Sequence, residues 1–333
     1  MGKRAGAISD EQLMGYERNN LSWLVLFQEY LEVKKANNRK ATSMKQYEKM
    51  ICPFLRLLPS DQANEEEITK AAFQYLNRPR KDGAALSNDT FNNRLTYLRT
   101  FFRWCQTKKG VFYDEKTGFP KALPLSDITK RHIDKRPKHQ NAKTLIALLS
   151  LCDQRRVSGL RDYALILLQL DTGIRPSEAL NLSTNDVHWE KPTPYIDVPA
   201  EVSKTGRWRP LPLNPTVIKA LKRYLKLRPK EWAASKWGNL LFLNNNGEPF
   251  KIRGWQQRMK MYSEKLAIKI TPYQLRHSAA VSSIRNGANA FKVQSLLGHT
   301  TMNMTLRYVN LEKSDILEES KTWSPVENMK DGQ

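Results

Sequence analysis

Residues 271–280 read TPYQLRHSAA, and this stretch joins a strong helix start to a cluster of polar side chains. Thr271 is a favourable N-cap and Pro272 suits the first helical position, so the sequence predicts a helix that begins here. Residues three and four apart share a helix face, which places Tyr273, Arg276 and His277 on one side. Taken alone, the stretch favours a solvated helix start over the wall of a functional site.

The charge of the chain sets it apart from an ordinary globular protein. Its 333 residues include 55 Lys or Arg and 33 Asp or Glu, for a formal net charge of +22. A field of that sign attracts polyanions, of which nucleic acid is the commonest. A ribosome-like protein or a protein of the membrane surface is the alternative. We expect no membrane partner, because the longest apolar run, YALILLQL at 163–170, is too short to span a bilayer.

The cysteines and the first residues bear on the compartment. Cys52, Cys105 and Cys152 are scattered and odd in number, so they predict neither a disulfide framework nor a metal site. The N-terminal residues have no apolar segment of the kind that a secretory signal requires. The sequence therefore predicts a protein of the cytoplasm, associated with the nucleoid if its polyanion is DNA.

The first part of the chain, residues 18–110, is predicted to be a helical domain. A helix beginning near Ser87 carries an apolar stripe at helical spacing. The stripe consists of Phe91, Leu95, Leu98, Phe102 and Cys105. Asn92, Thr96, Arg99 and Arg103 repeat at the same rhythm on another face. That second face would either lie on DNA phosphates, through Arg99 and Arg103, or be plain solvated surface.

Residues 111–142 lose all periodicity and are predicted to form an extended basic linker. The segment KRHIDKRPK at 130–138 is its most charged part. It would either touch a polyanion or act as a disordered spacer. The candidate contacts are Lys130, Arg131, Lys135, Arg136 and Lys138.

The second part, residues 143–320, alternates helices with short strands, and a polar tail follows at 321–333. A helix closes at Gly173, short strands flank a turn at Thr205-Gly206, and later helices begin at Asn289 and stop at Gly298. The predicted fold class is mainly α with a small antiparallel β-sheet, in which a helical domain precedes a mixed α/β domain.

Four separated segments of this second domain carry side chains that suit phosphate chemistry. Each of these side chains has an ordinary structural explanation when it is taken alone. Together, guanidinium groups can neutralise non-bridging oxygens, and a phenol can attack phosphorus. The residues are Arg175, Lys204, Arg276, His299 and Tyr308.

These motifs resemble the tyrosine recombinases, also called the phage integrase family. The matching segments are TGIRPSEALNLSTNDV, SKTGRWRPLPL, LRHSAA and LLGHTTMNMTLRYVN, in that order, within about residues 145–312. The helical first part looks like the SAM-like core-binding domain of the family. With no arm-binding domain expected before residue 18, the resemblance indicates a simple two-domain recombinase.

The resemblance implies a role for each matching residue. Arg175 and Arg276 would bind the scissile phosphate, and Lys204 would protonate the departing 5′-oxygen. His299 would bind the phosphate and help position the site, and Tyr308 would form the 3′-phosphotyrosyl link. The supporting positions are Glu178, Asp186 and His277.

The resemblance also implies the partners. Such enzymes need no metal and no nucleotide cofactor, and they act on double-stranded DNA. We expect a monomer or dimer in free solution and a tetramer in synapsis, with the segment after Tyr308 packing on a neighbouring protomer.

Tyr273 departs from the family pattern, which has histidine at this position as acceptor or relay of the nucleophile's proton. A phenol titrates near pH 10 and imidazole near pH 6.5, so tyrosine is a poor base at neutral pH. Tyr273 can still donate a hydrogen bond to a phosphate oxygen, and it is therefore counted among the predicted catalytic residues. This departure keeps open a non-catalytic DNA-binding protein, such as a phage or mobile-element repressor. A type IB topoisomerase shares the chemistry, but the two-domain size and the GH…TLRY segment fit a recombinase better.

Overall fold

The computed structural model describes residues 22–37, 41–80, 82–114, 116–133 and 139–309. The chain divides into two compact units at residues 134/135. Position 18 and residues 310–333 lie outside the described residues, so the predicted outer domain limits and the tail stay predictions. In the described part of the chain, no helix is long and apolar enough to cross a membrane.

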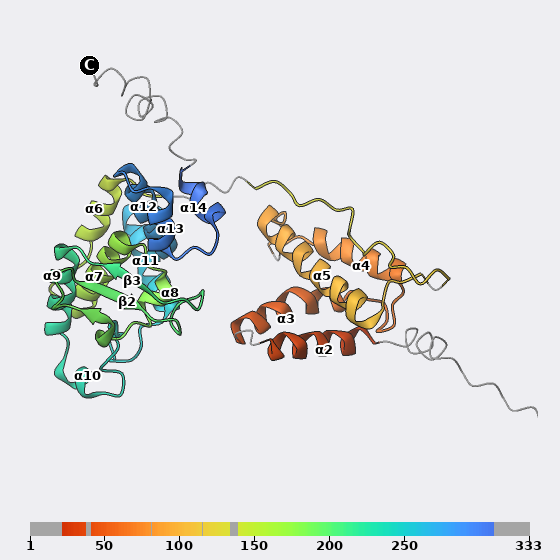
Figure 1. Cartoon of the computed structure of the whole chain (residues 1–333), viewed down its shortest axis with the longest axis horizontal. Helices are drawn as coiled ribbons and strands as arrows, with labels where there is room; N and C mark the ends of the chain where they lie inside the picture. Colours follow the sequence, from red (N-terminus) through yellow and green to blue (C-terminus); the bar gives the residue numbers. More distant parts are fainter. Residues whose placement is uncertain (1–21, 38–40, 81, 115, 134–138, 310–333) are drawn as a thin grey trace, which may run out of the picture. The chain divides into compact units, whose positions relative to one another are not determined.

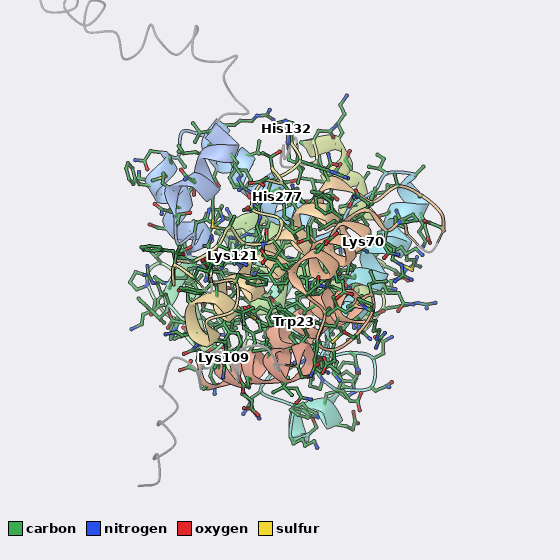
Figure 2. All side chains as sticks on the ribbon, turned by 90° about the vertical axis from the view of Figure 1, so that its right-hand side faces the viewer. Trp23, Lys70, Lys109, Lys121, His132 and His277 are labelled. Atoms are coloured by element: carbon green, nitrogen blue, oxygen red, sulfur yellow. The ribbon has the colours of Figure 1, made fainter. Side chains whose placement is uncertain are left out.

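The first unit is a cluster of helices around one apolar core (Figure 1). The apolar stripe predicted on its last helix is confirmed, since all five of its residues are buried. That helix begins directly after Ser87, close to the predicted start, and the Ser87 side chain caps it. From another helix, Trp23, labelled in Figure 2, stacks against Phe112. The helices are α2 (Trp23–Ala36), α3 (Ala41–Leu55), α4 (Glu65–Asn77) and α5 (Asn88–Lys109).

The second face of α5, which carries Asn92 and Arg99, contacts a segment of the predicted linker and is not open to solvent along its whole length. The guanidinium group of Arg99 donates to the backbone carbonyls of Leu125, Ser126 and Ile128. Asn92 exchanges two hydrogen bonds of 2.8 Å with the backbone of Arg131. Part of the segment predicted as a linker therefore packs on the first unit, where Phe112 and Leu125 are also buried.

The second unit is mainly helical around a small antiparallel sheet of order β1-β2-β3, as the sequence predicted. Val187 pairs with Ile196, and Ile196 pairs with Leu211. The strands are β1 (Val187–His188), β2 (Tyr195–Val198) and β3 (Arg209–Pro212). The helices are α6 (Ala142–Ser150), α7 (Val157–Thr172), α8 (Pro176–Ala179), the 3-10 helix η1 (Thr184–Asp186), α9 (Pro215–Lys226), α10 (Lys230–Ala234), α11 (Ile252–Leu266), α12 (Pro272–Arg285), α13 (Ala290–Leu297) and α14 (Met302–Val309).

Helix ends in the second unit fall where the sequence placed them. Thr271 caps α12 by accepting from the backbone of Gln274, and Pro272 is its first residue. Gly173 ends α7 and Gly298 ends α13, both in the left-handed conformation that glycine adopts without strain. Because α12 packs on α7, α13 and α14, these ends lie in one region of the unit (Figure 1).

Candidate active site

Arg175 is held at the start of α8 by two hydrogen bonds of its guanidinium group. Nη1 donates to Oε1 of Glu178 and Nη2 donates to the carbonyl of Gly298, both at 2.9 Å. The local cause is the turn at Gly173, which ends α7 and leaves Arg175 as the N-cap of the next helix. A side chain from one loop is thus tied to the end of a helix 123 residues further along the chain.

Glu178 lies at the centre of a buried charge network. Its Oε2 accepts from Nη2 of Arg209 at 2.6 Å, and its Oε1 also accepts from the backbone N–H of Lys204 at 3.1 Å. Burial alone would raise the pKa of this carboxyl, but the hydrogen bond and charge of Arg209, with Arg175, hold its pKa below the usual range. Glu178 is therefore an ionised carboxylate that fixes two guanidinium groups.

Arg276 brings a second catalytic candidate into the same region. It donates from Nη1 to the carbonyl of Gly173 at 2.6 Å and from Nη2 to the carbonyl of Leu297 at 2.7 Å. Its side chain is buried. Burial, followed by the charge of Arg175, lowers its pKa to about 9. The guanidinium groups of Arg175 and Arg276 thus form a positive region that is only partly neutralised by Glu178.

His299 follows directly after Gly298 and is buried as well. Its Nδ1 lies 2.8 Å from the hydroxyl of Thr305. Its ring stacks nearly parallel to the ring of Tyr308, with 6.2 Å between the centroids. Burial and the charges of Arg276 and Arg175 lower its pKa to about 4, so the ring is neutral at neutral pH.

Tyr308 is buried on α14, and its phenol oxygen has a hydrogen-bond partner. Oη lies 2.7 Å from Nδ1 of His277, which is presented by α12. Burial raises the pKa of Tyr308, against the opposing charge of Arg276. The phenol is therefore protonated at rest and has a hydrogen-bond partner from another helix.

Two of the predicted catalytic residues present their side chains to solvent. Lys204 is exposed, although its backbone N–H is fixed by Glu178. Tyr273 is 45% exposed, while Arg276 and His277 on the same helix turn inward. Within the described residues the phenol of Tyr273 has no hydrogen bond.

Asp186 supports the local fold rather than the candidate catalytic cluster. That cluster consists of Arg175, Glu178, Arg209, Arg276, His277, His299, Thr305 and Tyr308. Its Oδ2 accepts from the backbone N–H of Ser183 at 2.7 Å, which closes the capping box of η1. Among the residues described, its hydrogen bonds do not reach the two catalytic arginine candidates. The prediction of an organising role stays a prediction.

The side chains predicted to contact DNA differ in their exposure and in their contacts within the protein. Arg103 and Lys130 are exposed. Arg99 uses its guanidinium group on carbonyls, and Arg131 lies over the ring of Phe91 at 3.7 Å. Lys135, Arg136 and Lys138 lie outside the described residues. Contact with DNA stays a prediction for all of them.

Sequence reasoning missed two members of the cluster, Arg209 and Thr305. Arg209 begins β3, where burial alternates so that its side chain points inward to Glu178. Thr305 precedes Tyr308 by three positions and so shares its helix face. The alternation of buried and exposed residues in RPLP and the three-residue spacing in TLRY are the patterns that would have indicated these two side chains. Neither pattern indicates which residue each side chain contacts.

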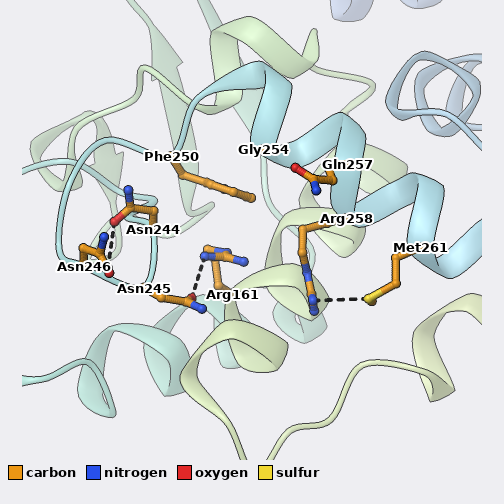
Figure 3. A pocket seen from close by; sticks show the side chains of 9 residues that line it. All are labelled: Arg161, Asn244, Asn245, Asn246, Phe250, Gly254, Gln257, Arg258 and Met261. Carbon is orange, nitrogen blue, oxygen red and sulfur yellow. Dashed lines mark hydrogen bonds between the residues drawn. The ribbon is translucent and has the colours of Figure 1, made fainter.

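A separate hollow of about 480 Å³ lies beside α11 (Figure 3). Arg161 and Arg258 line it, and both pair with the buried carboxylate of Asp162. Arg161 also donates to Asn245 at 3.3 Å, as the dashed line in Figure 3 shows. None of the predicted catalytic residues lines this hollow, and its guanidinium groups are already occupied.

Comparison with known proteins gives one consistent result. Residues 138–315 match the model of the phage integrase family. The chain is 30% identical over 296 residues to tyrosine recombinase XerC of Pelotomaculum thermopropionicum, covering 85% of this chain and 91% of that protein. It is 29% identical over 303 residues to XerC of Bacillus subtilis, covering 89% and 93%.

Solved structures agree with this fold. The Tn1549 transposon integrase in complex with circular intermediate DNA superposes with a TM-score of 0.69 at 21% identity, covering 87% of this chain and 95% of that one. The XerH site-specific recombinase bound to its difH substrate superposes with a TM-score of 0.67 at 22% identity, covering 87% and 82%.

Proposed function

The chain belongs to the phage integrase family and is a site-specific tyrosine recombinase, and from this premise we propose that it cleaves and rejoins double-stranded DNA through Tyr308. The observation that supports this assignment is the buried phenol of Tyr308 among His277, His299 and the two buried guanidinium groups. A phenol in such surroundings is suited to attack a phosphodiester.

The proposed reaction is a transesterification. Tyr308 Oη forms a bond to phosphorus as it loses its proton, and the bond from phosphorus to the 5′-oxygen breaks. Lys204 Nζ gives a proton to the departing 5′-oxygen, so a 5′-hydroxyl and a 3′-phosphotyrosyl ester result. The ester conserves the bond energy, and the 5′-hydroxyl of another strand reverses the step.

Phosphate binding is assigned to the two buried arginines. A guanidinium group carries five N–H donors, and two hydrogen bonds from each of Arg175 and Arg276 go to protein acceptors. The remaining donors suit the non-bridging oxygens, on which negative charge builds up in the transition state. His299, fixed through Thr305, is assigned one further hydrogen bond to these oxygens.

The partners follow from the same assignment. The proposed substrate is duplex DNA, which the net charge of +22 favours, and the first unit is proposed to act as the core-binding domain. Four protomers would assemble in synapsis, with a monomer or dimer before DNA binding. The cytoplasm, at the nucleoid, is the proposed place of action.

A covalent-trapping experiment tests the function. A duplex that the purified protein selects from a randomised pool is prepared with a nick near the cleavage point, so that a short piece diffuses away after cleavage. We expect a protein–DNA adduct that survives denaturation, with the modified peptide containing Tyr308. Tyr308→Phe should form none.

Tyr195→Phe is the matched control, since it removes a phenol from β2 outside the cluster. It should form the adduct at the rate of the unmodified protein. Absence of any adduct with intact DNA binding, or an adduct on Tyr308→Phe equal to that of the unmodified protein, would refute the assignment.

A further inference from the structure

We propose that His277 is the group that accepts the phenolic proton of Tyr308 during cleavage and returns it during rejoining. The inference rests on the proposed function of Tyr308. It assigns to α12 a proton acceptor one helical turn away from the position where the family pattern has histidine and this chain has Tyr273.

The contact itself carries the inference. Nδ1 of His277 and Oη of Tyr308 are 2.7 Å apart, within the range that proton transfer requires. The two ring centroids are 5.6 Å apart and the planes are tilted by 43°. The hydrogen bond joins α12 to α14 across 31 residues of sequence, so packing of the two helices creates it.

The surroundings of His277 keep its imidazole ring neutral, so that it can accept a proton. Burial, followed by the charge of Arg276, lowers its pKa, so the ring is neutral at neutral pH. A neutral imidazole accepts at one nitrogen only, and Oη must therefore donate if Nδ1 is the unprotonated nitrogen. The charged and titratable groups around this pair are Arg276 on α12, Arg307 on α14, and Arg175 and His299 from the loops beside them.

The other candidate acceptors are worse placed. Tyr273 is 45% exposed and would need a phenolate to act as base. His299 stacks its ring against Tyr308, and its Nδ1 is engaged by Thr305. Its pKa of about 4 also makes it a weaker base than ordinary histidine. His277 is the described side chain that forms a hydrogen bond with the nucleophile.

The proton balance closes within the site. In cleavage, the Oη–H bond of Tyr308 breaks as Oη bonds to phosphorus, and the proton passes to Nδ1 of His277. The resulting imidazolium lies beside the phosphodiester, whose negative charge offsets it. In rejoining, the attacking 5′-hydroxyl gives its proton back to Nζ of Lys204 and displaces the phenol, and the imidazolium returns its proton to Oη. Each group ends as it began.

His277→Asn is the central variant, because the amide oxygen of Asn can occupy the Nδ1 position and accept a hydrogen bond but cannot take the proton. On the nicked duplex we expect single-turnover cleavage to fall at least about 100-fold. DNA affinity and the melting temperature should stay close to those of the unmodified protein. Cleavage by the unmodified protein should decline as pH falls through the pKa of His277, and the variant should lack this decline.

A more acidic nucleophile separates proton transfer from mere positioning. Trifluorotyrosine at position 308 ionises more readily, so its attack depends less on a base. In the His277→Asn background, trifluorotyrosine should raise the single-turnover cleavage rate at least about tenfold. With His277 present it should change the rate little and flatten the acid side of the pH profile.

The outcomes are distinguishable. If the unmodified protein forms no adduct, the function of Tyr308 itself is refuted. The proton-acceptor role is overturned if the adduct forms normally and His277→Asn cleaves within about threefold of it. It is also overturned if the variant is slow but trifluorotyrosine restores nothing, because His277 would then only position the phenol.

Discussion

Glu178 and Arg209 form a buried ion pair in which Oε2 and Nη2 are 2.6 Å apart, and the same carboxylate also holds Arg175. One ionised acid thereby fixes two guanidinium groups from different segments of the second unit. The candidate catalytic cluster therefore depends on a residue that is not assigned any contact with DNA.

Glu178→Gln should destabilise the second unit strongly. The change preserves the shape but leaves Arg175 and Arg209 without their counter-charge, and breaking a buried pair in this way costs about 3–5 kcal/mol. Thermal unfolding should show a large fall in melting temperature. Asp197→Asn, at a partly exposed carboxylate on β2, is the control and should shift it far less.

The stability contributed by Glu178 should depend on pH. Its pKa is lower in the folded state than in the unfolded chain, so its contribution is complete above the unfolded value of about 4.3. The contribution is lost as the pH falls through the lower, folded value. Denaturant unfolding between about pH 5 and pH 3 should show this loss, and Glu178→Gln should reduce the slope in that window.

Thr305→Val should slow cleavage without weakening DNA binding. The hydroxyl of Thr305 lies 2.8 Å from Nδ1 of His299 and holds the imidazole ring in its orientation. Valine has the same shape and leaves Nδ1 without a partner, at a cost of about 1–3 kcal/mol. We expect roughly tenfold slower single-turnover cleavage. Thr305→Ser keeps the hydroxyl and should retain most of the rate, whereas equal loss in both variants would exclude this role.

Gly298→Ala should impair both stability and cleavage. Gly298 has φ +62°, and a Cβ there would lie 3.1 Å from the guanidinium group of Arg209. Gly287 provides the control, because it has φ +84° with open space around the added carbon. Both variants should lose about 1–2 kcal/mol from left-handed strain. Cleavage measured at saturating DNA should fall for Gly298→Ala alone.

Tyr273→Phe should leave folding unchanged and reduce cleavage modestly. The phenol is exposed and makes no hydrogen bond to the described residues, so the free energy of unfolding should change by less than about 0.5 kcal/mol. We expect its hydroxyl to donate to the scissile phosphate, which is worth about 0.5–1.5 kcal/mol, or roughly two- to tenfold in rate. An unaltered cleavage rate would place Tyr273 outside the reaction.

Replacing Lys135, Arg136 and Lys138 with Ala should weaken binding to all DNA sequences alike. Each phosphate group that the protein no longer neutralises should reduce the slope of log affinity against log salt by about 0.9. Lys219, Lys222 and Lys226 on α9, replaced together, change the net charge equally and serve as the control. Equal effects of the two sets would show that net charge alone is responsible.

The sequence determined the local structure of this protein and pointed to several residues of its candidate site. Thr271 and Pro272 start α12, Gly173 and Gly298 end their helices, and the apolar stripe of α5 is buried, because capping and periodicity act over a few residues. The motif residues also converge in one unit, as the family resemblance implied.

Only the tertiary structure decided which neighbour each polar group meets. Helix periodicity places Tyr273 and His277 on one side of α12, yet packing of α14 selects His277 for the phenol of Tyr308 and leaves Tyr273 exposed. In the same way, Arg99 binds loop carbonyls and Arg209 joins Glu178. These partners are tens of residues apart in sequence, so their pairing depends on how whole elements pack, which no local pattern encodes.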